Sequence, residues 1–169
     1  MPEFLTLQIP ASAVIAILAV CGVAVVTDIR QRRILNVVTF PAMAIGLALN
    51  TAAYGFSGLA FAASGLLIGV LLFVVPVAFM GRGAGDLKLL AALGALGGPA
   101  FVFWTALWSG ALGGVFAFVV LISQRRLGPV LAGFALDAQA GQFPVARSNI
   151  RLPYAVPIAA GAFIGLLFA

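Results

Sequence analysis

The sequence predicts an all-α integral membrane protein with six transmembrane helices and both termini on the non-cytoplasmic side. Its 169 residues are 64% hydrophobic and only 8% charged, with a mean hydropathy of +1.23. A soluble domain of this length needs roughly a quarter of its residues charged, so this chain is not expected to be stable in water. The uncharged stretches also have the lengths of membrane spans, and the basic residues lie between them.

The first half of the chain contains two uncharged stretches that predict three spans. A spanning helix needs about 20 mostly apolar residues. The stretch Phe4–Thr27 is long enough for one such helix. The stretch Ile34–Gly81 is long enough for two, with a turn near Asn50–Gly58. We therefore expect a helical hairpin to follow the first span.

The second half predicts three more spans and one long loop. Leu89–Gln124 can form two helices divided near Gly97–Pro99, and Leu152–Ala169 can form the last one. The segment 124–151 is predicted to be a cytoplasmic loop, because several glycines and prolines interrupt it. A seventh span over Leu127–Ala146 is the alternative, but it would place the basic residues that flank it on opposite sides of the membrane.

The six-span arrangement brings every Lys and Arg to one side of the membrane. Cytoplasmic loops carry an excess of these residues, so that side is predicted to be the cytoplasm. The whole chain, 1–169, is expected to form a single transmembrane domain. The basic residues are Arg30, Arg32, Arg33, Arg82, Lys88, Arg125, Arg126, Arg147 and Arg151.

The residue types present exclude several kinds of site. The chain has no histidine and a single cysteine, Cys21, so it cannot form a Ser/His or Cys/His catalytic pair or a zinc site with the usual ligands. The net charge of +5 reflects the membrane topology, because the basic residues are few and scattered between apolar stretches. We expect membrane lipids around the chain, and no cofactor, metal ion or nucleic-acid partner.

Four carboxylates remain as candidates for chemistry. Glu3 lies near the N-terminus, and Asp137 in the predicted loop is interpreted as a solvated charge. Asp28 ends the first predicted span and Asp86 begins the fourth, so antiparallel helices bring both to the cytoplasmic side. Ionisable residues at membrane depth favour a functional role. Two structural interpretations stay open: Asp86 as a helix N-cap, and Asp28 paired with Arg32 one turn later.

A pair of carboxyl groups supplies a complete chemistry for peptide hydrolysis. Two neighbouring carboxylates do not both ionise at low cost, so they share a proton, and one acts as base while the other acts as acid. Such a pair activates water without histidine, cysteine or a metal ion.

Three stretches of the chain resemble a known family. Gly83–Ala95 reads GAGDLKLLAALGA and resembles the GxGD signature of bacterial type IV prepilin peptidases. Asp28–Asn36 reads DIRQRRILN and resembles the other active-site stretch of that family, an aspartate followed by basic residues and Ile-x-Asn. Leu152–Pro157 reads LPYAVP and is similar to its proline-bearing last span.

This resemblance implies an intramembrane aspartic endopeptidase of six spans in the bacterial inner membrane, with its active site at the cytoplasmic side. It implies that Asp28 and Asp86 are the catalytic pair. Gly83 and Gly85 would position Asp86, and Lys88 would either orient the site or extend to the membrane interface. The implied partner is a prepilin or pseudopilin substrate with a hydrophobic N-terminal helix.

The chain departs from the longer members of the family. Those members carry a cytoplasmic insert with paired cysteines and also methylate the new N-terminus, and nothing of that insert is present here. The short form is similar to the peptidases of Tad/Flp pilus systems, so N-methyltransferase activity is not expected. Two other functions are alternatives: a small proton-coupled transporter that uses Asp28 and Asp86 as a relay, and a non-enzymatic pilus-assembly scaffold.

Overall fold

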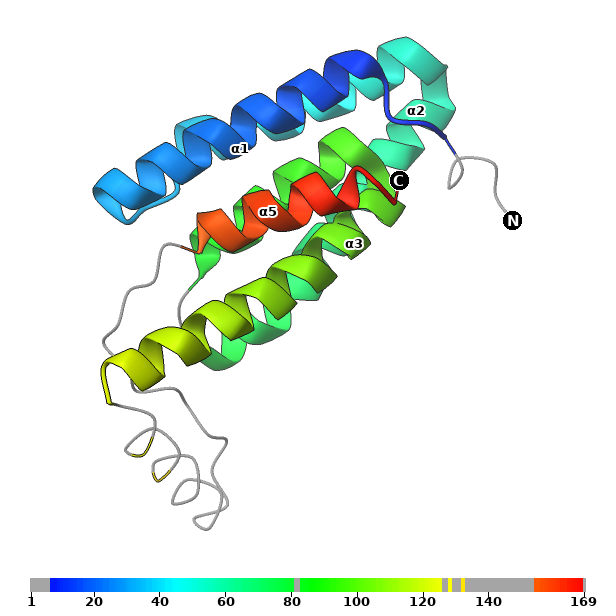
Figure 1. The fold of residues 1–169 in the computed structure, drawn as a ribbon. Coiled ribbons are helices and arrows are strands. Elements are labelled where there is room, and N and C mark those ends of the chain that lie inside the picture. The colour runs from blue at the N-terminus through cyan, green and yellow to red at the C-terminus, as the bar shows by residue number, and fades with distance from the viewer. Residues whose placement is uncertain (1–6, 81–82, 126–127, 129–131, 133–153, 169) are drawn as a thin grey trace.

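The computed structural model describes residues 7–80, 83–125, 128, 132 and 154–168, and this part of the chain contains helices and no strand. The elements are α1 (Ala11–Gln31), α2 (Asn36–Met80), α3 (Ala84–Ser123) and α5 (Ala155–Gly165). Figure 1 shows α5 lying beside both α1 and α3. The predicted all-α class is confirmed for the described residues.

Three of these helices are long and apolar enough to cross a membrane. They are α1, α2 and α3, and α5 is a shorter apolar helix. These helices support the predicted membrane embedding, whereas the count of six spans and the sides of the termini stay predictions. Apart from Gln124, Arg125 and two isolated positions, the predicted loop 124–151 lies outside the described residues, as do Glu3 and Asp137.

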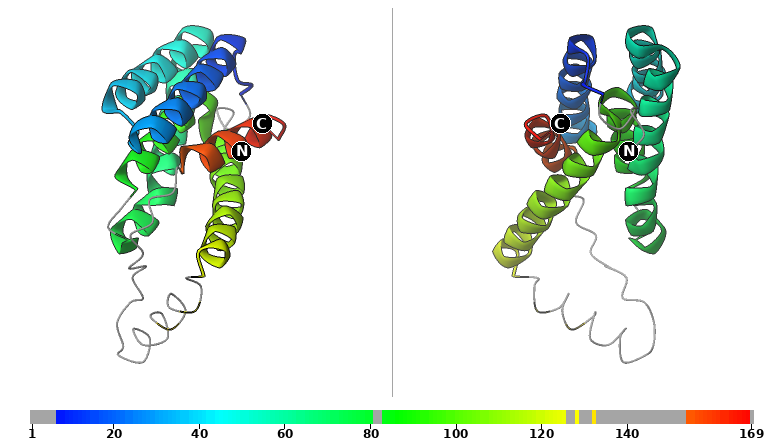
Figure 2. Two further views of the ribbon diagram at one scale, coloured as in Figure 1. Left: turned by 60° about the vertical axis from the view of Figure 1, so that its left-hand side comes forward. Right: turned by 90° about the vertical axis from the view of Figure 1, so that its right-hand side faces the viewer.

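Both α2 and α3 contain one non-helical residue at which the chain reverses direction (Figures 1 and 2). In α2 this residue is Gly55, with φ 60° and ψ −138°. In α3 it is Gly98, with φ 77° and ψ −174°. A positive φ is easily adopted only by glycine, because it has no Cβ. Both residues fall where the uncharged stretches predicted turns, near Asn50–Gly58 and Gly97–Pro99.

The first half of α3 forms the centre of the bundle. Every residue from Leu89 to Pro99 is buried. A helix that is buried all round must be covered on every side by other elements, and here α1, α2 and α5 all contact α3. The approach of α2 is close enough that a Cβ at Gly65 would meet the carbonyl oxygen of Gly94.

Asn50, which belongs to the neighbouring helix α2, stabilises α3 at the point where that helix is interrupted. Pro99 has no N–H, so the carbonyl of Ala95 loses its usual partner four residues on, and the reversal at Gly98 disturbs the carbonyl of Leu96. The buried Asn50 Nδ2 donates to both carbonyl oxygens, at 3.1 Å each. Backbone groups within a membrane protein must be satisfied internally, so this amide compensates for the irregular backbone.

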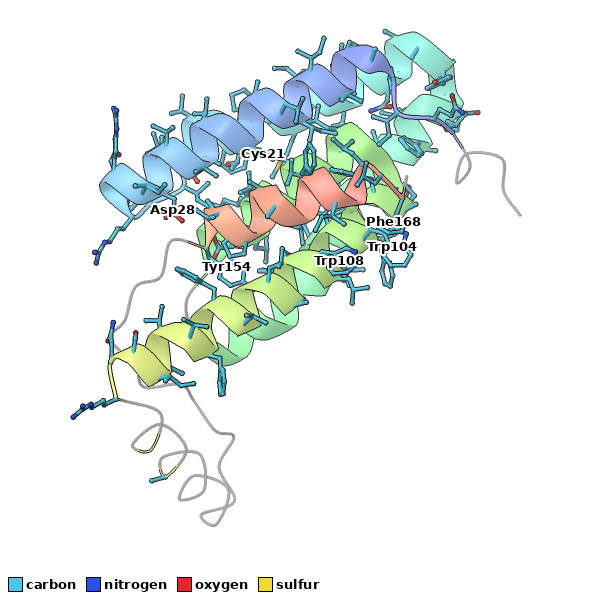
Figure 3. All side chains as sticks on the ribbon, viewed as in Figure 1. Cys21, Asp28, Trp104, Trp108, Tyr154 and Phe168 are labelled. Atoms are coloured by element: carbon cyan, nitrogen blue, oxygen red, sulfur yellow. The ribbon has the colours of Figure 1, made fainter. Side chains whose placement is uncertain are left out.

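Small residues and aromatic rings hold α5 against the second half of α3. A Cβ at Gly161 would lie 2.7 Å from the amide nitrogen of Ser109, so the two helix backbones are in close contact. Beyond the end of α5, Phe168 stacks on Trp104 with ring centroids 5.2 Å apart. The labelled side chains in Figure 3 show this contact far from Asp28.

Candidate active site

Asp28 belongs to the inward face of α1. The residues of α1 that are buried recur at helical spacing: Ala13, Ile17, Cys21, Ala24 and Asp28. The Asp28 side chain is only 7% exposed, whereas its neighbours Ile29 and Arg30 are exposed. The carboxyl group is therefore directed into the bundle, as is typical of functional ionisable residues in membrane proteins.

The partner of the Asp28 carboxyl group comes from the other end of the chain. Its Oδ2 atom accepts a hydrogen bond from the backbone N–H of Ala155, at 2.9 Å. Ala155 is the first residue of α5, and Figure 3 shows Asp28 facing this helix. Arg32 instead ends α1 through its own backbone, where its N–H donates to the carbonyl of Asp28 at 2.8 Å, and its side chain is exposed. The interpretation of Asp28 as a residue paired with Arg32 is therefore not supported.

Asp86 lies in the first turn of α3, and this turn packs against the connection that follows Asp28 and α1. The N-cap of this helix is Gly83, with φ 99° and ψ 13°, and no side chain caps the helix. Glycine tolerates this backbone conformation without strain. The interpretation of Asp86 as the N-cap is therefore wrong, and its carboxyl group is available for another role.

Helix N-termini lie beside both carboxyl groups. Asp86 is in the first turn of α3, and Asp28 binds the first amide of α5. The aligned peptide dipoles give a helix N-terminus a partial positive charge that stabilises an anion. Asp28 itself lies in the last turn of α1, where the opposite end of the dipole disfavours negative charge. The α5 amide offsets this effect.

The two stretches that carry Asp28 and Asp86 are in direct contact. Lys88 Nζ donates to Asn36 Oδ1 at 2.9 Å and lies 5.3 Å from the centre of the Phe40 ring. A Cβ added to Gly85 would lie 3.2 Å from the Cβ of Ile34, so the first turn of α3 packs closely on the α1–α2 connection. The structure thus brings all five predicted site residues to one end of the bundle.

Tyr154 is a neighbour of the site to which the sequence pattern assigns no role. It precedes Ala155 directly, and Ala155 is the residue whose backbone N–H binds Asp28. The stretch Leu152–Pro157 carried the resemblance to the last span, and topology alone placed it on the same side as both aspartates. This predicted topology was the feature of the sequence that could have pointed to Tyr154, but it did not indicate which atom would contact Asp28.

The described residues contain no group of three or more His, Cys, Asp or Glu side chains that could hold a metal ion. The groups at this end of the bundle that can take part in acid–base chemistry include the carboxyl groups of Asp28 and Asp86, and the first amide of α5 lies beside Asp28.

A comparison with protein families gives a match between residues 15–118 and the model of the type IV leader peptidase family. This segment includes Asp28 and Asp86, and it ends before α5. No curated protein and no solved structure matches the chain.

Proposed function

Because the chain belongs to the type IV leader peptidase family, we propose that it is an intramembrane aspartic endopeptidase that removes leader peptides from type IV prepilins or pseudopilins. Cleavage takes place at the cytoplasmic face of the bacterial inner membrane. The observation that carries this proposal is the inward-facing, 7% exposed carboxyl group of Asp28, at the end of the bundle where the first turn of α3, which contains Asp86, packs on Ile34.

Asp28 and Asp86 are proposed as the catalytic residues. In the proposed mechanism one carboxylate takes a proton from water as the water attacks the scissile carbonyl carbon. The other carboxyl group first donates a hydrogen bond to the carbonyl oxygen and then supplies a proton to the leaving amine. The Ala155 amide donates to one oxygen of Asp28 at 2.9 Å and thereby orients the carboxyl group for this step.

Gly83, Gly85 and Lys88 are proposed as positioning residues for Asp86. Gly83 starts α3 with a positive φ, and Gly85 allows the first turn to approach Ile34. The Lys88 side chain, one turn further on, donates a hydrogen bond to Asn36 at the start of α2. Together they set the height and the rotation of the Asp86 side chain relative to Asp28.

Membership of the family indicates a prepilin-type substrate, whose hydrophobic segment needs an apolar surface next to the scissile bond. A groove between α3 and α5 offers such a surface, and its lining includes the residues that directly follow Ala155. The groove is lined by Leu112, Phe116, Val156, Pro157 and Ala160. Family membership also indicates a protease and thus disfavours the transporter and scaffold functions.

The proposal is tested by incubating the purified protein in detergent with a type IV prepilin and following the shift in substrate mass. Cleavage is expected to continue in excess EDTA and in serine- or cysteine-directed inhibitors, because a carboxyl pair needs neither a metal ion nor a nucleophilic side chain. The measurement is the initial rate with and without chelator. Loss of activity in EDTA that a divalent ion restores would contradict the mechanism, and absence of cleavage under all conditions would contradict the function.

The cytoplasmic location of the loop 124–151 is a second prediction. Single cysteines placed in this loop of a Cys21→Ala protein should be protected from membrane-impermeant thiol reagents in intact cells, because the predicted six-span topology puts all basic residues on the side of this loop. Disruption of the cells should expose them to the reagent, which serves as the positive control. Labelling of these cysteines in intact cells would show that the loop lies outside the cell and that the predicted topology is wrong.

A further inference from the structure

Tyr154 stands directly before the amide that binds Asp28, and its side chain contacts two other helices. Its ring lies against Phe73 of α2, with centroids 6.2 Å apart and planes at 56°. Its hydroxyl donates to the carbonyl oxygen of Ser109 in α3, at 3.4 Å. It covers Gly113 so closely that a Cβ there would lie 2.6 Å from the ring.

The start of α5 depends on these contacts because no side chain caps the helix. An uncapped first turn frays unless tertiary packing holds it. Tyr154 is itself the N-cap residue of α5, and Ala155 follows as the first helical residue. The packed tyrosine ring therefore restrains the backbone of Tyr154 and, with it, the next amide, which donates to the Asp28 carboxyl group.

We propose that Tyr154 is a positioning residue for Asp28: its ring fixes the first turn of α5 and thereby holds the Ala155 amide that orients the Asp28 carboxyl group. The inference rests on the proposed peptidase function. It adds a residue that lies outside the family match to residues 15–118.

The ring, and not the hydroxyl group, is expected to supply most of the effect. An O–H···O hydrogen bond is normally about 2.5–3.0 Å long, so the 3.4 Å contact with Ser109 is weak. Packing of an aromatic ring against Phe73 and the backbone of Gly113 does not need the hydroxyl. Tyr154→Phe should therefore behave as the wild type, and Tyr154→Ala should not.

The chain provides two matched controls. Gly113→Ala should displace the ring, whereas Gly114→Ala, one residue on, places its methyl group in open space. Phe168→Ala removes an aromatic contact from the far end of the same helical segment without touching Tyr154. These variants separate a specific effect at the start of α5 from a general loosening of the helix.

The experiment measures the orientation of Asp28 without relying on activity. The protein in detergent is treated with a water-soluble carbodiimide and glycinamide, and amidation of Asp28 is followed by peptide mass spectrometry. Asp28 should react several-fold faster in Tyr154→Ala and Gly113→Ala than in the wild type. Its reaction should be unchanged in Tyr154→Phe, Gly114→Ala and Phe168→Ala. Tyr154→Leu replaces Tyr154→Ala if the latter does not accumulate.

The same variants are assayed for cleavage of a peptide that spans a type IV prepilin leader junction. Loss of positioning should lower kcat by roughly 10- to 100-fold with little change in KM, since small misplacements of a reacting group act on the chemical step. Unchanged Asp28 amidation in Tyr154→Ala, or equal acceleration in Phe168→Ala, would overturn the inference. A wild type that does not cleave would instead defeat the proposed function, and the amidation comparison would still decide the role of Tyr154.

Discussion

Asp28→Asn and Asp86→Asn are each expected to abolish prepilin cleavage while the protein still inserts and accumulates. A single carboxyl group cannot serve as both base and acid, so the rate should fall by roughly 10³-fold or more. Asparagine keeps the shape of the side chain, and its Oδ1 can still accept the hydrogen bond from Ala155. The measurement is the cleavage rate per folded protein, with folding checked by size-exclusion chromatography.

The matched control for these variants is Asp137→Asn, which removes a carboxylate from the predicted loop. It should cleave at the wild-type rate, because a solvated loop charge takes no part in the reaction. Inactivity of Asp137→Asn together with activity of either other variant would refute the assignment of the pair. Normal cleavage by all three would refute the aspartic mechanism itself.

Gly65→Ala is expected to destabilise the helical bundle strongly. A methyl group there would meet the carbonyl oxygen of Gly94 and would lie 2.7 Å from the backbone of Gly98. These are backbone atoms of the central helix, so no side-chain rotation can relieve the overlap. Overpacking of this kind costs about 1–3 kcal/mol or more. Thermal unfolding in detergent should show a lowered Tm, and cleavage should fall because α3 carries Asp86.

Gly22→Ala is the control for this substitution. Gly22 is exposed on α1, and a Cβ there would meet no atom within 4 Å. Alanine is also a better helix former than glycine, so the Tm should be equal to or slightly above that of the wild type. Equal Tm values for Gly65→Ala and the wild type would show that α2 and α3 do not approach as closely as described.

The family resemblance inferred from the motifs is confirmed by the family match. The apolar composition also predicted the membrane class, and the turns predicted inside the two long uncharged stretches coincide with the reversals of α2 at Gly55 and α3 at Gly98. Because consecutive spans run in opposite directions, the same pattern placed Asp28 and Asp86 at one end of the bundle. These conclusions needed only lengths, charges and local sequence.

The packing of the helices could not be predicted from the sequence. Nearly every position in the spans is apolar, and lipid is as apolar as the protein interior, so periodicity does not distinguish a buried face from a lipid-facing one. Only the tertiary structure shows that the first half of α3 lies at the centre of the bundle and that Asn50 binds a backbone carbonyl where α3 is interrupted. The hydrogen bond between the Ala155 amide and Asp28 is likewise visible only in the tertiary structure. It depends on how two helices that are distant in sequence are rotated against each other.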